Sequence, residues 1–291
     1  MTEPLIYIVL LNYKGYTDTT ACINSLRQID YSNYNIIVVD NLSQDGSYEK
    51  LKAENGDCVV ILAPENNGFS AGNNLGIHYA LDNGADYVLM LNNDTEVKTD
   101  FLSRMVDVAD ENTVVTPSIY FYSEPHDIWY ADGRINFNRC TVSNGLDAES
   151  KYCNYASGCC LLMSRKILET VGDWAEEYFM YYEDMDYSLR IAQAGFKIFY
   201  EKNAVVYHKV GRTAGRDSKL SIYYNVRNRF YVIKKYRFNK KCWWYSVCTR
   251  LVRGLGGILK NSNEKVIFQA MSDYKKGLMG KRYVKEETSC G

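Results

Sequence analysis

The chain has 291 residues, 46% of them hydrophobic and 24% charged, which is the composition of a folded globular protein. A chain of this length buries a substantial core, as one large domain or slightly more. Its formal net charge of -1 argues against a nucleic-acid binder. The charge is unevenly spread, because Lys and Arg greatly outnumber the two acids between residues 237 and 285.

The cysteines and the first apolar run bear on the cellular compartment. The nine cysteines show no metal-ligand spacing, and Cys159 and Cys160 are adjacent. An odd number of cysteines without a signal sequence predicts reduced thiols in a cytoplasmic protein. Residues 5–11 are too short an apolar run for a secretory signal or a membrane span.

Apolar runs alternate with helical stretches through the first third of the chain. Strands are predicted at residues 5–11, 36–39, 59–62 and 87–91, and the clearest helix covers residues 70–81. This alternation predicts a parallel sheet with right-handed crossovers. The last of these strands is an uninterrupted apolar run, as in a strand buried on both faces.

Polar side chains follow these strands where they leave the sheet. They are Asn12, Asp40, Asn66 with Asn67, and Asn92, Asn93 and Asp94. Ligands of open α/β sheets bind outside the carboxyl ends of the strands. There Asp94 could hold a divalent cation that neutralises a diphosphate, and Asp40 could bind a base or ribose. Taken alone, each group is explained as well or better by turn and loop-capping chemistry.

Gly68, Gly72 and Gly76 do not have the spacing of a dinucleotide fingerprint, and no Walker lysine follows them. A nicotinamide cofactor or a P-loop is therefore not expected.

Residues 181–190 form the most informative stretch of the second half. A buried helical face is predicted from the spacing of Met185, Leu189, Ala192 and Phe196. Gly195 is expected to end this helix. Glu183 and Asp184 fall in its first turn, where the helix dipole favours ionised carboxylates. Asp186 and Arg190 are four residues apart, which predicts a structural ion pair.

Later segments carry further candidates. A strand predicted at residues 205–208 ends in His208. A lone histidine is more often a packing or surface residue than a ligand. Imidazole is nevertheless an acceptable ligand for Mn²⁺. Residues 211–216 are basic and flanked by glycines, either a loop that closes over a diphosphate or an ordinary solvated loop. Arg227 carries a guanidinium, which suits a phosphate contact.

The basic tail contains a predicted amphipathic helix. Its apolar residues are Trp243, Trp244, Val247, Leu251, Leu255 and Ile258, interleaved with Lys240, Lys241, Arg250 and Arg253. Such a helix either lies on an anionic membrane surface or packs its aromatic residues on the catalytic domain or on a second subunit, as in a homo-oligomer. The sequence favours neither alternative.

Taken in order, the motifs resemble those of family 2 glycosyltransferases. They are Asn12 with Tyr13; residues 38–41 with 45–47; residues 66–69 with Gly72, Asn73 and Asn74; and residues 92–94. The resemblance runs from about residue 5 to residue 229. The form of the third motif most resembles bacterial rhamnosyltransferases and galactofuranosyltransferases of surface-polysaccharide assembly.

This resemblance implies an α/β GT-A fold, a mostly parallel sheet flanked by helices, and an inverting transfer that uses Mg²⁺ or Mn²⁺. It places a nucleotide-sugar-binding half at residues 1–110, an acceptor-binding and catalytic half at 111–235, and a helical C-terminal extension at 236–291. The implied donor is dTDP-rhamnose, ahead of UDP-galactofuranose and other UDP-hexoses. The implied acceptor is a saccharide or lipid-linked saccharide at the inner face of the plasma membrane.

The resemblance also implies roles for single residues. Donor contacts are expected from Asn12, Asp40, Asn67, Asn73, Asn93 and Arg227, metal ligation from Asp94 and His208, and acceptor contacts from Trp129, Gly158 and Glu183. Asp184 matches the family's catalytic base. One departure matters, since the family's Asp-x-Asp motif has a single carboxylate here, that of Asp94.

Three alternatives compete with this interpretation. A nucleotidyltransferase would carry a glycine-rich basic loop after its first strand, and residues 12–15 form a poor version of one. A non-catalytic nucleotide-sugar-binding protein would not need Asp94, Asp184 and His208 together. The only support in the sequence for a purely structural membrane-associated protein is the basic tail.

Overall fold

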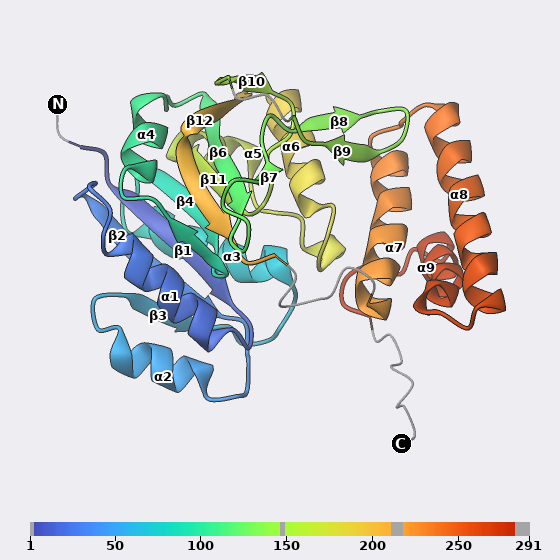
Figure 1. Ribbon diagram of the computed structural model, residues 1–291, viewed down its shortest axis with the longest axis horizontal. Coiled ribbons are helices and arrows are strands. Elements are labelled where there is room, and N and C mark those ends of the chain that lie inside the picture. The colour runs from blue at the N-terminus through green and yellow to red at the C-terminus, as the bar shows by residue number, and fades with distance from the viewer. Residues whose placement is uncertain (1–2, 146–148, 211–217, 283–291) are drawn as a thin grey trace.

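The computed structural model describes residues 3–145, 149–210 and 218–282. In these residues a ten-stranded mixed sheet is built from strands between residues 6 and 208, with the order β10-β12-β6-β11-β4-β1-β2-β3 along its main path (Figure 1). Most neighbouring pairs on this path are parallel. The sheet and its flanking helices confirm the predicted α/β class.

The first half forms the parallel side of the sheet. Its strands are β1 (Ile6–Asn12), β2 (Tyr34–Asp40), β3 (Val59–Leu62) and β4 (Tyr87–Asn92). The helices between them are α1 (Tyr16–Leu26), α2 (Ser47–Glu54) and α3 (Phe69–Asp82). All four predicted strands and the predicted helix at residues 70–81 are confirmed, with boundaries shifted by no more than two residues.

The second half extends the same sheet. Its strands are β5 (Thr95–Val97), β6 (Thr113–Phe121), β7 (Ile128–Tyr130), β10 (Lys151–Cys153), β11 (Cys160–Ser164) and β12 (Lys197–His208), and β8 (Arg134–Asn136) pairs with β9 (Thr141–Ser143) as a separate hairpin. The helices are α4 (Phe101–Asp107), α5 (Arg165–Val171), the 3₁₀ turn η1 (Glu176–Tyr178) and α6 (Glu183–Gln193). β11 lies antiparallel between β4 and β6, so the two predicted halves share one sheet.

Alternate side chains of the central strands face two separate cores. On β1, Ile6, Ile8 and Leu10 join a cluster with α1 and α4, whereas Tyr7 and Val9 join one with α3, α5 and α6. Both faces of the sheet are therefore covered by helices, as Figure 1 shows. This explains why the β4 run is apolar at every position.

The buried face of α6 differs from the predicted one. Met185 is buried, but Ala192 is exposed, and Tyr187 and Ile191 are buried instead. Tyr187 is buried because its ring stacks on the buried indole of Trp174, with ring centroids 4.4 Å apart. The spacing of apolar residues does not reveal this contact.

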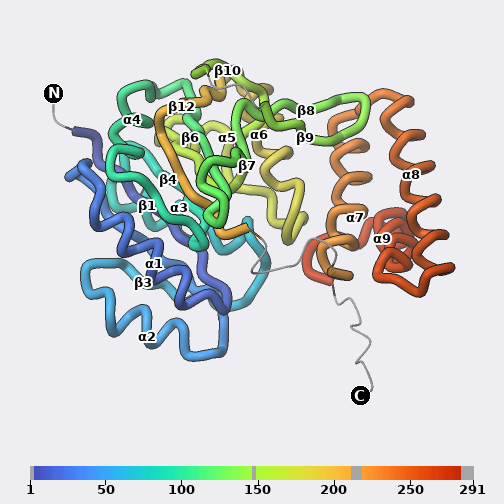
Figure 2. The backbone as a smooth tube through the Cα atoms, viewed as in Figure 1, coloured from blue at the N-terminus to red at the C-terminus, as the bar shows by residue number. Residues whose placement is uncertain are grey.

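Three helices form a body at one end of the molecule (Figure 2). They are α7 (Lys219–Lys235), α8 (Lys240–Leu259) and α9 (Val266–Lys275), with the 3₁₀ turn η2 (Asn263–Lys265) between the last two. Aromatic residues of α7 pack on α9, for example Phe230 against Tyr274. No helix in the described part of the chain is both long enough and apolar enough to cross a membrane.

The glycine spacing on α3 serves close packing against the sheet. A Cβ atom on Gly72 would lie 2.3 Å from Leu11 Cδ1, and one on Gly76 would lie 2.4 Å from Val9 Cγ1. Real carbon atoms do not approach so closely, so α3 lies against β1 only because these positions lack side chains.

We therefore expect Gly76→Ala to lower the free energy of unfolding by about 1 to 2 kcal/mol, because the clash with stiff Val9 exceeds the gain in helix propensity. Urea denaturation measures this change. Gly56→Ala is the control, since no atom lies within 4 Å of its added methyl group. An unchanged stability of the Gly76 variant would contradict this packing.

Candidate active site

The register of the sheet brings the predicted donor residues to one edge. Asn12 lies opposite Asp40 in the β1–β2 pair, and Leu11 lies opposite Asn92 in the β1–β4 pair. The carboxyl ends of three parallel strands therefore meet, as the positions of their polar residues predicted.

A hydrogen-bond chain connects this edge. Asp40 Oδ2 accepts from Asn12 Nδ2 at 2.5 Å, Asn12 Oδ1 accepts from Thr19 Oγ1 at 2.9 Å, and Thr19 Oγ1 accepts from Asn93 Nδ2 at 2.7 Å. Ser43 adds backbone and hydroxyl donors to Asp40, both at 2.8 Å. Asn12 and Asp40 are fully buried, so the protein itself uses these polar groups to shape the edge.

Two further predicted donor residues, Asn67 and Asn73, lie on the α3 side. Asn67 is exposed in the loop before α3, and Asn73 donates to the carbonyl of Phe69 within the helix at 2.9 Å. Their neighbour Asn74 bonds the backbone N–H and C=O of Trp174, at 2.9 and 3.0 Å. Asn74 therefore ties α3 to the segment before α6, a role that the sequence did not reveal.

The two predicted metal ligands are in contact. His208 lies opposite Thr95 in the β12–β5 pair, and its Nε2 is 3.1 Å from Asp94 Oδ1. Trp129 presents its ring edge-on to His208, with centroids 4.6 Å apart. Burial works to lower the pKa of His208, but Cys159 and Asp94 outweigh it and raise that pKa to about 10. Burial raises the pKa of the Cys159 thiol.

The donor set fits Mg²⁺ or Mn²⁺ bound together with a substrate. Asp94 offers carboxylate oxygens, and His208 Nδ1 is buried without a hydrogen-bond partner in the described residues. Within those residues no group of three or more His, Cys, Asp or Glu side chains could hold a metal. A cation held by Asp94 and His208 would displace the proton of the imidazole, because a ligating histidine must be neutral. It would complete its coordination with phosphate oxygens and water, as Mg²⁺ does in many phosphate sites.

Glu183 and Asp184 begin α6, as predicted. Asp184 Oδ1 accepts the backbone N–H of Met185 at 2.8 Å, and Oδ2 accepts the hydroxyl of Tyr155. Burial raises the pKa of both carboxyl groups, and the charge of Asp184 raises that of Glu183 further. The Tyr155 hydroxyl and backbone N–H groups oppose the effect of burial on the pKa of Asp184 and favour its ionised form.

One short segment, residues 155–159, contacts both the metal-ligand pair and the carboxylates of α6. Tyr155 bonds Asp184, and a Cβ atom on Gly158 would lie 3.6 Å from Asp184 Cβ. At its other end, the carbonyl of Cys159 accepts the N–H of Asn92 at 2.8 Å, two residues before Asp94. The candidate base and the candidate metal ligands thus lie on either side of this segment.

Comparison with known proteins identifies the family of the chain. Residues 6–172, more than half of the chain, match the family model described as Glycosyl transferase family 2. The chain belongs to this family. Its mixed α/β architecture is the GT-A fold.

Three similar proteins illustrate the range of the family. The chain is 24% identical over 243 residues to a dTDP-rhamnosyl transferase, RfbF, of Shigella flexneri, a match that covers 79% of this chain and 80% of the relative. It is 38% identical over 72 residues to an N-acetylglucosaminyl-diphospho-decaprenol L-rhamnosyltransferase of Mycobacterium tuberculosis, covering 25% and 24% of the two chains. The structure of a mannosyltransferase of Pyrobaculum calidifontis, in complex with GDP-Man and Mn²⁺, superimposes with a TM-score of 0.59 at 13% identity, over 95% of this chain and 76% of that one.

The remaining predicted donor residue, Arg227, lies on helix α7. It is fully buried on α7, where its guanidinium donates to the carbonyl of Gly280 at 2.7 Å and to that of Tyr178 at 3.0 Å. Its Nε donates to Asn228 Oδ1 at 3.0 Å. These hydrogen bonds support a structural role for Arg227, and its predicted phosphate contact stays a prediction.

Asn228 holds the turn that leads into α6. Its Nδ2 atom lies within hydrogen-bond distance of the carbonyls of Tyr178, Met180 and Tyr181, at 3.0, 2.8 and 2.8 Å. In this turn Tyr181 and Tyr182 have φ angles of 65° and 74°, which bulky residues rarely adopt. Such a conformation persists only when surrounding contacts enforce it. No role was predicted for Asn228, because its burial cannot be inferred from the sequence.

The predicted basic loop at residues 211–216 lies outside the described residues. Its proposed closure over the diphosphate stays a prediction.

We expect Arg227→Lys to lower the free energy of unfolding by about 2 to 4 kcal/mol, because Lys cannot satisfy the buried carbonyls that the guanidinium bonds. Donor affinity, measured at a temperature where the variant is folded, should be retained. Arg104→Lys is the control, since Arg104 is exposed and its one ion pair among the described residues is with Asp100. Normal stability together with lost donor binding would restore the phosphate role.

Proposed function

We propose that the protein is an inverting, metal-dependent glycosyltransferase that moves rhamnose from dTDP-rhamnose to a hydroxyl group of a saccharide acceptor in bacterial cell-surface polysaccharide synthesis. The observation that carries this proposal is the position of residues 155–159, which contact Asp184 on one side and lie beside Asp94 and His208 on the other. A nucleophile activated at Asp184 and a diphosphate held at Asp94 would be close together.

The reaction is a single displacement. The acceptor oxygen attacks the anomeric carbon of the donor sugar, the bond from that carbon to the phosphate oxygen breaks, and the nucleoside diphosphate leaves. Asp184 takes the proton of the attacking hydroxyl, so it must be ionised when the acceptor binds. Asp94 and His208 would hold a divalent cation, which would supply positive charge where the leaving diphosphate becomes more negative.

The donor assignment is supported by the name of the Shigella flexneri relative, a dTDP-rhamnosyl transferase similar over most of both chains. UDP-galactofuranose or another UDP-hexose is the alternative donor. Asn12, Asp40, Asn67, Asn73 and Asn93 stay predicted donor residues. Asn93 fits this role best, since its side chain is only partly buried beside Asp94.

The acceptor is proposed to be a lipid-linked saccharide at the inner face of the plasma membrane. This is supported by the local similarity to a rhamnosyltransferase named for a diphospho-decaprenol substrate. The predicted acceptor residues Trp129, Gly158 and Glu183 lie around the candidate base and metal ligands. Of these, Trp129 offers a partly exposed ring on which a sugar could stack.

We expect Asp184→Asn to reduce transfer by about 10²- to 10⁴-fold, because the amide cannot accept the proton of the acceptor hydroxyl. Donor binding, measured by the shift in melting temperature with the sugar nucleotide and Mn²⁺, should be retained. Transfer at a near-normal rate would remove Asp184 from the mechanism. Loss of donor binding and transfer together would show only a disrupted site, and Asp184→Glu would then test whether a carboxylate restores turnover.

Tyr155→Phe should move the acidic limb of the kcat/KM profile to higher pH. The Tyr155 hydroxyl lowers the pKa of Asp184 against the effect of burial, so its removal raises that pKa further. Since the base works only when ionised, activity is then lost at a higher pH as the pH falls. A pH–rate profile measures this, and an unchanged acidic limb would contradict the assignment of Asp184 as the titrating base.

A further inference from the structure

The solvent-facing side of α8 is apolar. Trp244, Leu251, Val252, Leu255, Ile258 and Leu259 are between 38% and 87% exposed. At 3.6 residues per turn these positions fall on one side of the helix. A surface helix normally turns polar residues to solvent, so this apolar stripe indicates a contact surface.

The opposite face of α8 is fixed by close packing, which excludes a different rotation of the helix. A Cβ atom on Gly254 would lie 2.7 Å from the ring of Phe268, and one on Gly257 would lie 2.6 Å from the backbone nitrogen of Lys265. Cys242 and Ser246 are also fully buried on this face. The helix therefore packs inward through its small residues and leaves its large apolar residues outside.

The body that carries the stripe is strongly basic. Residues 237–282 contain eleven Lys and Arg but two acids, whereas residues 1–236 contain 31 acids and 22 Lys and Arg. Both acids of residues 237–282 are already engaged. Glu264 pairs with Arg253 at 3.1 Å, and Asp273 accepts the hydroxyl of Tyr223 at 2.7 Å. The excess of positive charge is thus not neutralised within this region.

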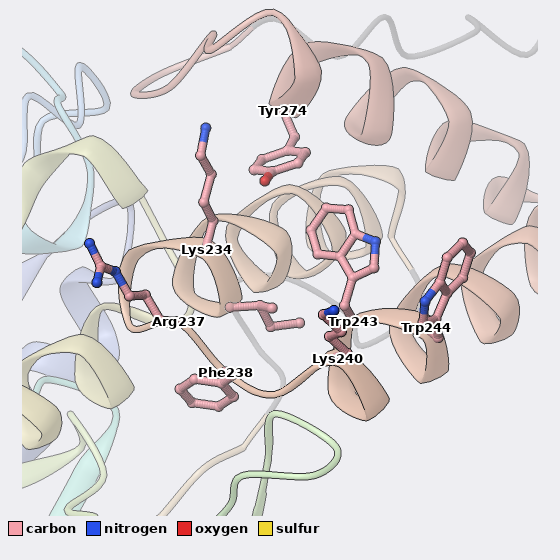
Figure 3. A pocket seen from close by; sticks show the side chains of 8 residues that line it. Lys234, Arg237, Phe238, Lys240, Trp243, Trp244 and Tyr274 are labelled. Carbon is pink, nitrogen blue, oxygen red and sulfur yellow. The ribbon is translucent and has the colours of Figure 1, made fainter.

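A hollow of about 410 Å³ adjoins the start of the stripe. It is lined by Lys234, Arg237 and Lys240 together with Trp243, Trp244 and Tyr274, and Figure 3 shows these side chains around it. In the described residues no carboxylate forms an ion pair with Lys234, Arg237, Lys240 or Lys241. A phosphate group could enter here without displacing a protein anion.

We propose that α8 docks the protein on an anionic lipid surface. The apolar stripe enters the boundary between headgroups and acyl chains, and the cations at the start of α8 contact lipid phosphates. A second copy of the chain fits less well, because two such basic bodies would repel each other. The arrangement suits a helix that lies on a membrane, since none of the described helices could cross one.

The test is flotation of the full-length protein with vesicles, without any donor or acceptor, so it does not depend on the enzymatic proposal. We expect binding to phosphatidylcholine vesicles that contain phosphatidylglycerol, and much weaker binding to phosphatidylcholine alone. Lys240→Gln with Lys241→Gln should weaken binding about thirtyfold, at about 1 kcal/mol for each charge. Leu255→Ser with Leu259→Ser should weaken it at least about tenfold, through lost apolar burial.

Matched controls separate docking from general effects. Leu62→Ser removes an exposed leucine from β3, and Lys50→Gln with Lys52→Gln removes two exposed charges from α2. Both controls should bind vesicles like the wild type. All variants should keep the wild-type melting temperature, because the changed side chains are exposed.

Three outcomes would overturn the proposal. One is absence of binding to the anionic vesicles. Another is equal loss of binding in the control variants. The third is a stable dimer in light scattering that the α8 substitutions dissociate, which would assign the stripe to a second copy of the chain.

Discussion

The candidate site depends on the hydrogen bonds that Arg227 and Asn228 donate to the backbone before α6. These side chains bond carbonyls of residues 177–181, in a turn whose aromatic residues adopt positive φ angles. The strain costs of order 1 to 3 kcal/mol for each such residue. It is offset because the donors and the carbonyls are buried and would otherwise be unsatisfied. The result is a fixed starting position for Glu183 and Asp184.

The buried carboxylate of Asp186 connects α6 to the C-terminal helices. Asp186 is fully buried and accepts from Tyr178 at 2.9 Å, from Tyr236 at 2.8 Å and from Arg190 at 2.9 Å. Lys235 lies 2.7 Å from it. Since Tyr236 and Lys235 come from the end of α7, this cluster joins α6 to the helical body. The C-terminal helices therefore support α6, which carries the candidate base, and they also carry the apolar stripe of α8.

The sequence predicted the sheet and most of its edge, because apolar runs and the polar residues that end them are local features. The pairing of Asp186 with Arg190 was predicted for the same reason and is confirmed. The contact between Asp94 and His208 was expected only from the family resemblance. The two residues are 114 positions apart, and no spacing rule applies over that separation. The role of Arg227, the buried face of α6 and the orientation of α8 depend on contacts between distant segments. Periodicity does not contain that information, which is why the buried face of α6 was predicted wrongly in part and the orientation of α8 was left open. The phosphate contact of Arg227 stays a prediction.

The most direct test of the central claim is the melting temperature of the protein with dTDP-rhamnose, UDP-hexoses and GDP-mannose, each with and without Mn²⁺. A ligand at about one hundred times its dissociation constant adds about 2.7 kcal/mol to the stability of the folded state. We predict stabilisation by dTDP-rhamnose with Mn²⁺ that is absent without the metal and lost in Asp94→Ala. Stabilisation by none of these sugar nucleotides, or stabilisation that needs neither Mn²⁺ nor Asp94, would contradict the account.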